Sequence, residues 1–147
     1  MISNPLEHQT QPTGMTCVCT CLAMLCGRPA SDLIELYHHS YYNAKTLDLA
    51  DILVMEGFKF TREMAGQVKT MLPGAVYLLT VPSLNIKGGL HQILVDYRDP
   101  ERPQVLDPAK GYAGRMYYTV DSIEADEEDN AFLLFSWIVD YTITDRS

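Results

Sequence analysis

The chain has 147 residues, of which 47% are hydrophobic, and it carries a formal net charge of −8. This length predicts a single domain over residues 1–147, large enough to bury a core without metal ions or disulfides. Only 11 residues are Lys or Arg, and they form no basic run. Nucleic-acid binding depends on clustered basic side chains, so we expect neither nucleic acid nor an anionic membrane as a partner. A peptide with basic residues would match the sign of the charge.

The four cysteines, at positions 17, 19, 21 and 26, lie in one short stretch of the chain. Secreted disulfide frameworks spread their cysteines along the sequence, and neighbouring cysteines on a helix point in different directions. Residues 1–14 lack the basic stretch and apolar run of a signal peptide. No segment reaches the roughly 18 apolar residues of a membrane span. These features favour free thiols and a cytoplasmic location.

The first half of the chain has the pattern of helices, which we expect over residues 15–25, 31–38 and 46–56. The first of these follows Pro12-Thr13-Gly14 and ends before Gly27, which are typical start and stop signals. The second has Ser31 as its N-cap, and the third has Thr46.

The second half of the chain has the pattern of strands, expected over residues 75–81, 90–97, 104–106, 115–120 and 132–144. The acidic segment 121–129 reads as a solvated loop or the start of a helix. Helices followed by strands predict an α+β fold, with the 15–25 helix packed against an antiparallel sheet. Ten apolar side chains are expected in the core: Leu22, Met24, Leu25, Leu53, Val76, Leu78, Ile93, Val95, Leu133 and Phe135.

Cys17 stands near the expected start of the first helix. A thiolate there feels the positive end of the helix dipole, which lowers the pKa and favours a nucleophile. A free cysteine is more often a small, buried apolar residue. We assign that structural role to the other cysteines, Cys19, Cys21 and Cys26.

Three more residues complete a catalytic pattern with Cys17. His91 opens an apolar strand, and Asp107 ends a short strand 16 residues later, so a hairpin would bring the carboxylate to the ring and fix its tautomer. Gln11, six residues before Cys17, is placed to donate to an oxyanion together with the Cys17 backbone N–H. Each residue alone has a simpler structural explanation: a packed histidine, an Asp-Pro turn and a polar arm.

Taken in order, these residues resemble the active-site pattern of the double-glycine (bacteriocin-processing) peptidases. The run 11–24, QPTGMTCVCTCLAM, has that family's glutamine six residues before the cysteine and a Cys-Leu-x-Met stretch after it. The segments 90–95, LHQILV, and 105–111, VLDPAKG, are similar to its histidine strand and its Asp-Pro-x-x-Gly block. The resemblance spans residues 11–111.

The resemblance implies a papain-like fold and a cysteine peptidase that acts on a peptide or protein, with no cofactor and no metal. It implies these roles: Cys17 as nucleophile, His91 as base, Asp107 orienting the base, and Gln11 in the oxyanion hole. Thr16 and Val18 depart from the family, which usually has an acidic residue before the cysteine and a glycine after it. We expect a freestanding relative, and we do not carry over specificity for double-glycine leader peptides.

Three other interpretations stay open. A zinc site built from the cysteines and His38-His39 is disfavoured, because the Cys-x-Cys-x-Cys spacing scatters thiolates around a helix. The same fold could catalyse deamidation or acyl transfer, since each reaction begins with thiolate attack on an acyl carbon. The third alternative is a protein-binding module with a catalytically silent site.

Overall fold

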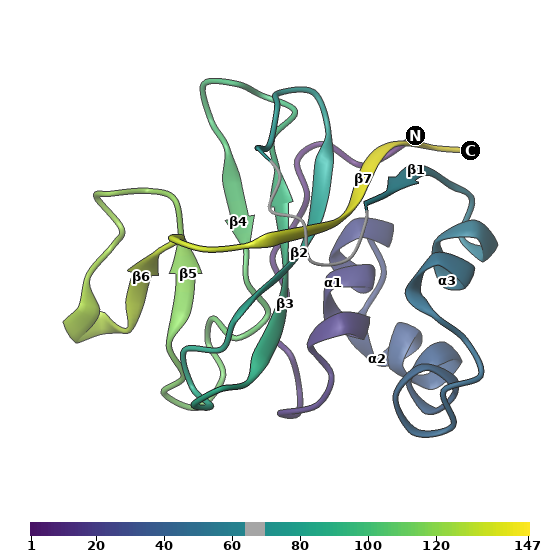
Figure 1. The fold of residues 1–147 in the computed structure, drawn as a ribbon, viewed down its shortest axis with the longest axis horizontal. Coiled ribbons are helices and arrows are strands. Elements are labelled where there is room, and N and C mark those ends of the chain that lie inside the picture. Colours follow the sequence, from purple (N-terminus) through teal and green to yellow (C-terminus); the bar gives the residue numbers. More distant parts are fainter. Residues whose placement is uncertain (64–69) are drawn as a thin grey trace.

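The computed structural model describes residues 1–63 and 70–147, and it has the predicted α+β class (Figure 1). The helical elements are α1 (Cys17–Cys26), α2 (Ala30–Leu33), the π-helix η1 (Ile34–Asn43), α3 (Leu49–Met55) and the 3₁₀ turn η2 (Glu127–Asp129). The strands are β1 (Phe58–Arg62), β2 (Val76–Pro82), β3 (Leu90–Asp96), β4 (Gln104–Leu106), β5 (Tyr117–Thr119), β6 (Ala131–Leu133) and β7 (Ile138–Arg146). The helices α1 to α3 lie on one side of the main sheet, and β5 and β6 lie on the other.

The main sheet has the strand order β1-β7-β2-β3-β4, and all its neighbouring strands are antiparallel, as predicted. The short strand β4 pairs only with Leu94–Asp96 of β3. The beginning of β3 is therefore open, on that side, to groups from α1 and from the residues after β4. A separate pair, β5 with β6, is parallel, which the prediction of a purely antiparallel sheet did not include.

One predicted strand was wrong in detail, and one observed strand was not predicted. The predicted strand 132–144 is divided into β6 and β7, because the chain crosses there from the small sheet to the main one. Strand β1 was not predicted. Its five residues give too short an alternation to be distinctive, and its pairing with the end of β7 is a contact distant in sequence.

Helix α1 is the centre of the core between the helices and the sheet. Its residues from Cys19 to Cys26 are all buried, so the helix is enclosed on nearly every side. It begins at Cys17, two residues later than predicted, and ends at Gly27, which has a left-handed backbone (φ 69°). This conformation is one that glycine adopts without strain, and it stops the helix.

Most of the predicted core is buried: Leu22, Met24, Leu25, Leu53, Val76, Leu78, Ile93 and Val95. Leu133 and Phe135 were wrong, since they are 48% and 64% exposed. Leu133 belongs to the two-stranded ribbon. Phe135 lies in the crossing to β7, where its ring tilts against Tyr118 at a centroid distance of 5.8 Å.

The predicted helix starts also need correction. Asp48, not Thr46, caps α3: its side chain accepts a hydrogen bond from the Asp51 backbone N–H, and the Asp51 side chain accepts one from the Asp48 N–H. This reciprocal pair satisfies two donors at once, which a single threonine does not. The helix predicted over 31–38 begins at Ala30 and continues through η1, so Ser31 is not its cap.

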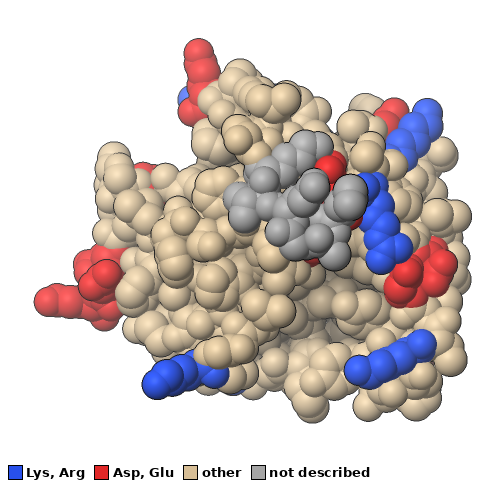
Figure 2. All heavy atoms as spheres, in the orientation of Figure 1, with Lys and Arg blue, Asp and Glu red and all other residues tan. Residues whose placement is uncertain are grey.

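The charge of the surface is unevenly distributed. Figure 2 shows acidic side chains gathered at the β5–β6 end, where the exposed acidic residues of the 121–129 segment lie.

Within the described ranges, no single helix combines the length and apolar composition that a membrane span requires.

Glu56, the residue that ends α3, joins the helical layer to the last strand. Its carboxylate accepts hydrogen bonds from Arg28 Nη1 (3.0 Å), Arg146 Nη2 (3.1 Å) and the Tyr37 hydroxyl. Arg146 also donates to the backbone carbonyl of Cys26 at the end of α1. One partly buried carboxylate thus connects the ends of α1, α3 and β7 to a side chain in the first half of η1.

Replacement of this carboxylate should destabilise the fold. Glu56→Ala leaves two guanidinium groups without their partner, and we expect it to lower the free energy of unfolding by about 2–3 kcal/mol, a value reduced for the exposure of Arg28. Glu35→Ala, at an exposed position of η1, is the matched control and should change stability by less than about 0.5 kcal/mol. Urea denaturation measures both, and equal midpoints for the two variants would contradict this role.

Candidate active site

Cys17 is the first residue of α1, and its side chain opens into a surface pocket of about 210 Å³. The residues that line this pocket are Cys17, Val18, Tyr41, Thr80, Leu90, His91 and Gln92. They come from α1, η1, β2 and β3, so the pocket lies at the junction between the helices and the sheet. The N-terminus of a ten-residue helix points its positive dipole end at Cys17, as predicted.

The predicted contact between His91 and Asp107 is present. His91 is the second residue of β3, and Asp107 directly follows β4, its antiparallel partner. The ring nitrogen Nε2 of His91 donates a hydrogen bond of 2.6 Å to Oδ1 of Asp107. With Nε2 used in this way, Nδ1 is the nitrogen left to exchange a proton with Cys17.

The Asp107 carboxylate is rigidly held. It is 1% exposed, and its oxygens accept hydrogen bonds from the backbone N–H groups of Ala109 (Oδ1, 2.9 Å) and Tyr118 (Oδ2, 2.8 Å) as well as from His91. Three donors thus satisfy a carboxylate that is closed to water. The orientation of the His91 ring is therefore set by a carboxylate that is itself fixed.

The environment of Cys17 favours a thiolate. Burial raises the pKa of this thiol, but hydrogen bonding to His91, the positive charge of the ring and the backbone N–H groups of Gln92 and Val18 outweigh burial and lower it. Burial lowers the pKa of His91, and its contacts with Asp107 and Cys17 overcome this and raise the pKa to about 9. Both shifts favour a thiolate beside an imidazolium over a neutral thiol beside a neutral ring, and the charged pair is the reactive form of a cysteine nucleophile.

The other three cysteines have the opposite environment. Burial raises the pKa of Cys19 and of Cys26 to about 11. Cys21 is fully buried, its thiol donates to the Gln92 carbonyl (3.4 Å), and burial raises its pKa strongly. These thiols are therefore structural, whereas Cys17 alone of the four is activated.

The N-terminal arm that carries Gln11 is fastened to the loop after Asp107. His8 Nε2 donates to the Asp107 carbonyl (2.7 Å), and the Gln11 backbone N–H donates to the Pro108 carbonyl (2.8 Å). Gly111 (φ 86°) permits the close approach, because a Cβ at this position would lie 2.9 Å from the Thr10 hydroxyl oxygen.

The Gln11 side chain is buried, but it is not among the residues that line the Cys17 pocket. Its Nε2 donates to the Thr13 carbonyl (2.8 Å), which engages one of its two amide hydrogens. Its Oε1 accepts no hydrogen bond from the described residues. The role of Gln11 in an oxyanion hole therefore stays a prediction, and it would use the second amide hydrogen.

Several contributors to the site were not predicted. Backbone N–H groups of Tyr118, Gln92 and Val18 hold Asp107 and the Cys17 thiolate, and backbone donors are independent of side-chain identity. Tyr41 and Thr80 line the pocket, and the sequence around them carries no catalytic motif. Only the folded topology brings these groups to Cys17.

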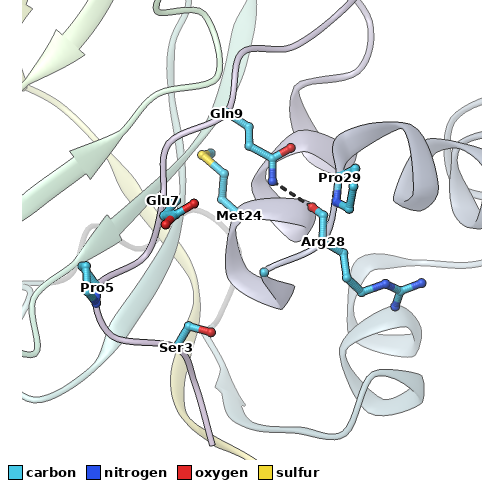
Figure 3. A pocket seen from close by; sticks show the side chains of 8 residues that line it. Ser3, Pro5, Glu7, Gln9, Met24, Arg28 and Pro29 are labelled. Carbon is cyan, nitrogen blue, oxygen red and sulfur yellow. Dashed lines mark hydrogen bonds between the residues drawn. The ribbon is translucent and has the colours of Figure 1, made fainter.

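A larger pocket of about 530 Å³ lies near the C-terminal end of α1 (Figure 3). Met24, Glu7 and Arg28 are among its lining residues. The side chain of Gln9 closes one part of it by donating to the Arg28 carbonyl (2.8 Å) and accepting from the Ala30 N–H (2.8 Å). Among the described residues, those that line this pocket include no cysteine, no histidine and no pair of carboxylates. The smaller pocket at Cys17 is therefore the better candidate for an active site.

The zinc interpretation finds no geometric counterpart. Within residues 1–63 and 70–147, no group of three or more His, Cys, Asp and Glu side chains is arranged to hold a metal ion. His38 instead stacks on Tyr42, with ring centroids 5.2 Å apart.

No family model, no curated protein and no solved structure matches this chain.

Alkylation should separate Cys17 from the other thiols. We expect iodoacetamide to modify Cys17 at neutral pH well before Cys19, Cys21 and Cys26, because only Cys17 has a lowered pKa and an opening to solvent. The rate should fall as the pH drops through the pKa of Cys17, where the thiolate gains a proton. Peptide mass spectrometry after timed quenching measures the rate at each thiol.

Asp107→Asn tests the cause of this activation. Loss of the carboxylate lowers the pKa of His91, so a smaller fraction of the ring is protonated. With less positive charge beside it, the Cys17 thiol has a higher pKa. The alkylation rate of Cys17 at neutral pH should then fall about tenfold, the effect of one pKa unit. Asp129→Asn, on the exposed turn η2, makes the same charge change and should leave the rate unaltered. Equal rates at all four thiols, or no effect of Asp107→Asn, would contradict the assignment.

Proposed function

We propose that this protein is a papain-like cysteine peptidase that hydrolyses an amide bond in a peptide or protein through an acyl-enzyme. The observation that carries the proposal is the Cys-His-Asp arrangement of Cys17, His91 and the buried Asp107 carboxylate. In it a thiol of lowered pKa interacts with an imidazole of raised pKa, and nucleophilic catalysis by cysteine needs these opposite shifts. The resemblance of residues 11–111 to the double-glycine peptidases supports the same reaction.

In the proposed reaction the Cys17 thiolate attacks the carbonyl carbon and forms a tetrahedral oxyanion. The Cys17 backbone N–H and the Gln11 amide would stabilise this charge. His91, protonated at rest, donates its Nδ1 proton to the leaving amine as the C–N bond breaks and a thioester forms. Neutral His91 then removes a proton from water, which attacks the thioester and releases the acid. Asp107 keeps the ring in one tautomer throughout.

The shape of the pocket agrees with a substrate that lies across the helix–sheet junction. Val18 forms part of the wall next to Cys17, where the double-glycine peptidases usually have glycine. We infer that this side chain narrows the cleft on one side of the scissile bond. The proposed site of action is the cytoplasm, where reducing conditions keep Cys17 and the other free cysteines as thiols.

The test is mass spectrometry of a cytosolic extract treated with wild-type protein or with Cys17→Ala. We expect new peptide termini with the wild type alone, because the variant lacks the nucleophile. Gln11→Ala should remain folded and produce these termini about 10²–10³ times more slowly, as for other lost oxyanion donors. Gln104→Ala, at an exposed position of β4, serves as the control for a polar truncation and should keep full activity.

Each alternative outcome has a distinct signature. A mass gain of one dalton at Gln or Asn residues of the extract proteins, without new termini, would show that the reaction is deamidation and not peptide-bond hydrolysis. No difference between wild type and Cys17→Ala would overturn the enzymatic proposal and favour a binding module.

A further inference from the structure

Asp140 is a carboxylate that a β-bulge turns toward the active-site face of the sheet. Along β7, Tyr141 pairs with Leu78 of β2 and Val139 pairs with Leu79, which leaves Asp140 as an extra residue in the ladder. Val139 belongs to the core on the β5–β6 side, whereas Tyr141 belongs to the core under the helices. A bulge changes the direction of a side chain locally, and here it directs Asp140 to the same side as Tyr141.

The hydrogen bonds of Asp140 place it against the Cys17 pocket. Its Oδ2 accepts from the Thr80 hydroxyl (2.6 Å) and from Gln92 Nε2 (3.3 Å). Both donors line the pocket that contains Cys17 and His91. The carboxylate therefore lies next to Thr80 and Gln92 of the pocket wall, although Asp140 itself is not among the lining residues.

One oxygen of this carboxylate is unused. Oδ1 accepts no hydrogen bond from the described residues, and none of their Lys, Arg or His side chains forms an ion pair with Asp140. Asp140 is half-buried, and its Oδ1 is not among the buried unpaired atoms of the described residues, so this oxygen is open to solvent. A partly buried carboxylate gains most from a cation that completes its hydrogen bonding.

The pKa of Tyr41, another residue of the pocket wall, reflects the negative charges around this pocket. Burial raises the pKa of Tyr41, and the nearby charges of Cys17, Tyr141 and Asp140 raise it further. Tyr41 also lines the pocket, so it lies near both Cys17 and Asp140. In the pocket wall, His91 is the positive group, and it is already paired with Asp107.

We propose that Asp140, held by Thr80 and Gln92, forms an acidic subsite beside Cys17 that binds a Lys or Arg side chain of the substrate. The Oδ1 atom would accept from the ammonium or guanidinium group. Val18, Tyr41 and the 76% exposed Leu90 would contact its aliphatic stem, and the Tyr41 ring would add cation–π attraction. The inference deepens the proposed peptidase function, on which it rests, by naming the residue class that is bound next to the scissile bond.

Charged thiol reagents test the subsite without requiring peptidase activity. Wild-type protein and Asp140→Asn are treated with methanethiosulfonates that carry a trimethylammonium group or a sulfonate group, and the rates at Cys17 are divided by the rate with neutral methyl methanethiosulfonate. This division removes any change in the pKa of Cys17. We expect the cation-to-anion ratio to fall about tenfold in Asp140→Asn, because a unit charge near the thiolate is lost.

Two matched variants act as controls. Asp140→Glu retains the charge and should keep most of the preference for the cation, and Asp129→Asn, at a distant exposed position, should keep all of it. Asparagine at position 140 can still accept from Thr80, so the bulge is expected to persist; circular dichroism checks this. An unchanged ratio in Asp140→Asn would overturn the subsite while leaving the peptidase proposal intact.

The cleavage sites found in the extract give a second measurement. With the wild type, the residues next to the new termini should be enriched in Lys or Arg, and Asp140→Asn should lose this enrichment. Cleavage without any enrichment would overturn the subsite. If no new termini appear at all, the peptidase proposal fails, and the reagent ratio alone decides whether the cation site exists.

Discussion

The structure depends most on the fixed position of the Asp107 carboxylate. The two carboxylate oxygens accept hydrogen bonds from the His91 ring and from the backbone N–H groups of Ala109 and Tyr118. The backbone carbonyl of Asp107 accepts a hydrogen bond from His8. These bonds connect β3, the loop after β4, β5 and the N-terminal arm at one residue. Among the described residues, the Tyr118 N–H is the one donor to Oδ2, so its loss would leave a buried acceptor unsatisfied at a cost of about 1–3 kcal/mol. The geometry of the site and the packing of the small β5–β6 sheet are therefore maintained by the same interactions.

Burial and pairing act against each other at Cys17 and His91. Desolvation alone would keep the thiol protonated and the imidazole neutral, which is the unreactive state. The N-terminus of α1, the N–H groups of Gln92 and Val18, and the Asp107 carboxylate reverse both effects. The site is thus partly closed to water while the pKa shifts favour its charged form, and electrostatic contacts are strong in such surroundings. Cys19, Cys21 and Cys26 show the result of burial without such pairing.

The sequence was informative where the contacts are local or follow from one hairpin. Gly27 marks the end of α1, and the order of Cys17, His91 and Asp107 was sufficient to predict that β3 and β4 bring the last two together. The sequence was less informative about features that the pairing of backbone segments determines. The bulge at Asp140 and the parallel pairing of β5 with β6 arise from strand register, which no residue type specifies. The predicted burial of Phe135 failed because an apolar run was read as one strand, whereas it crosses between two sheets.

The proposed reaction requires a thiolate–imidazolium pair of Cys17 and His91 in the resting protein. The most direct measurement is the protonation of His91 by nitrogen-detected NMR of the histidine side chains as a function of pH. We expect His91 to carry protons on both ring nitrogens at neutral pH, to lose one near pH 9, and to titrate at lower pH in Cys17→Ser. A His91 ring that is neutral at pH 7, with a pKa at or below the ordinary value of about 6.5, would contradict it.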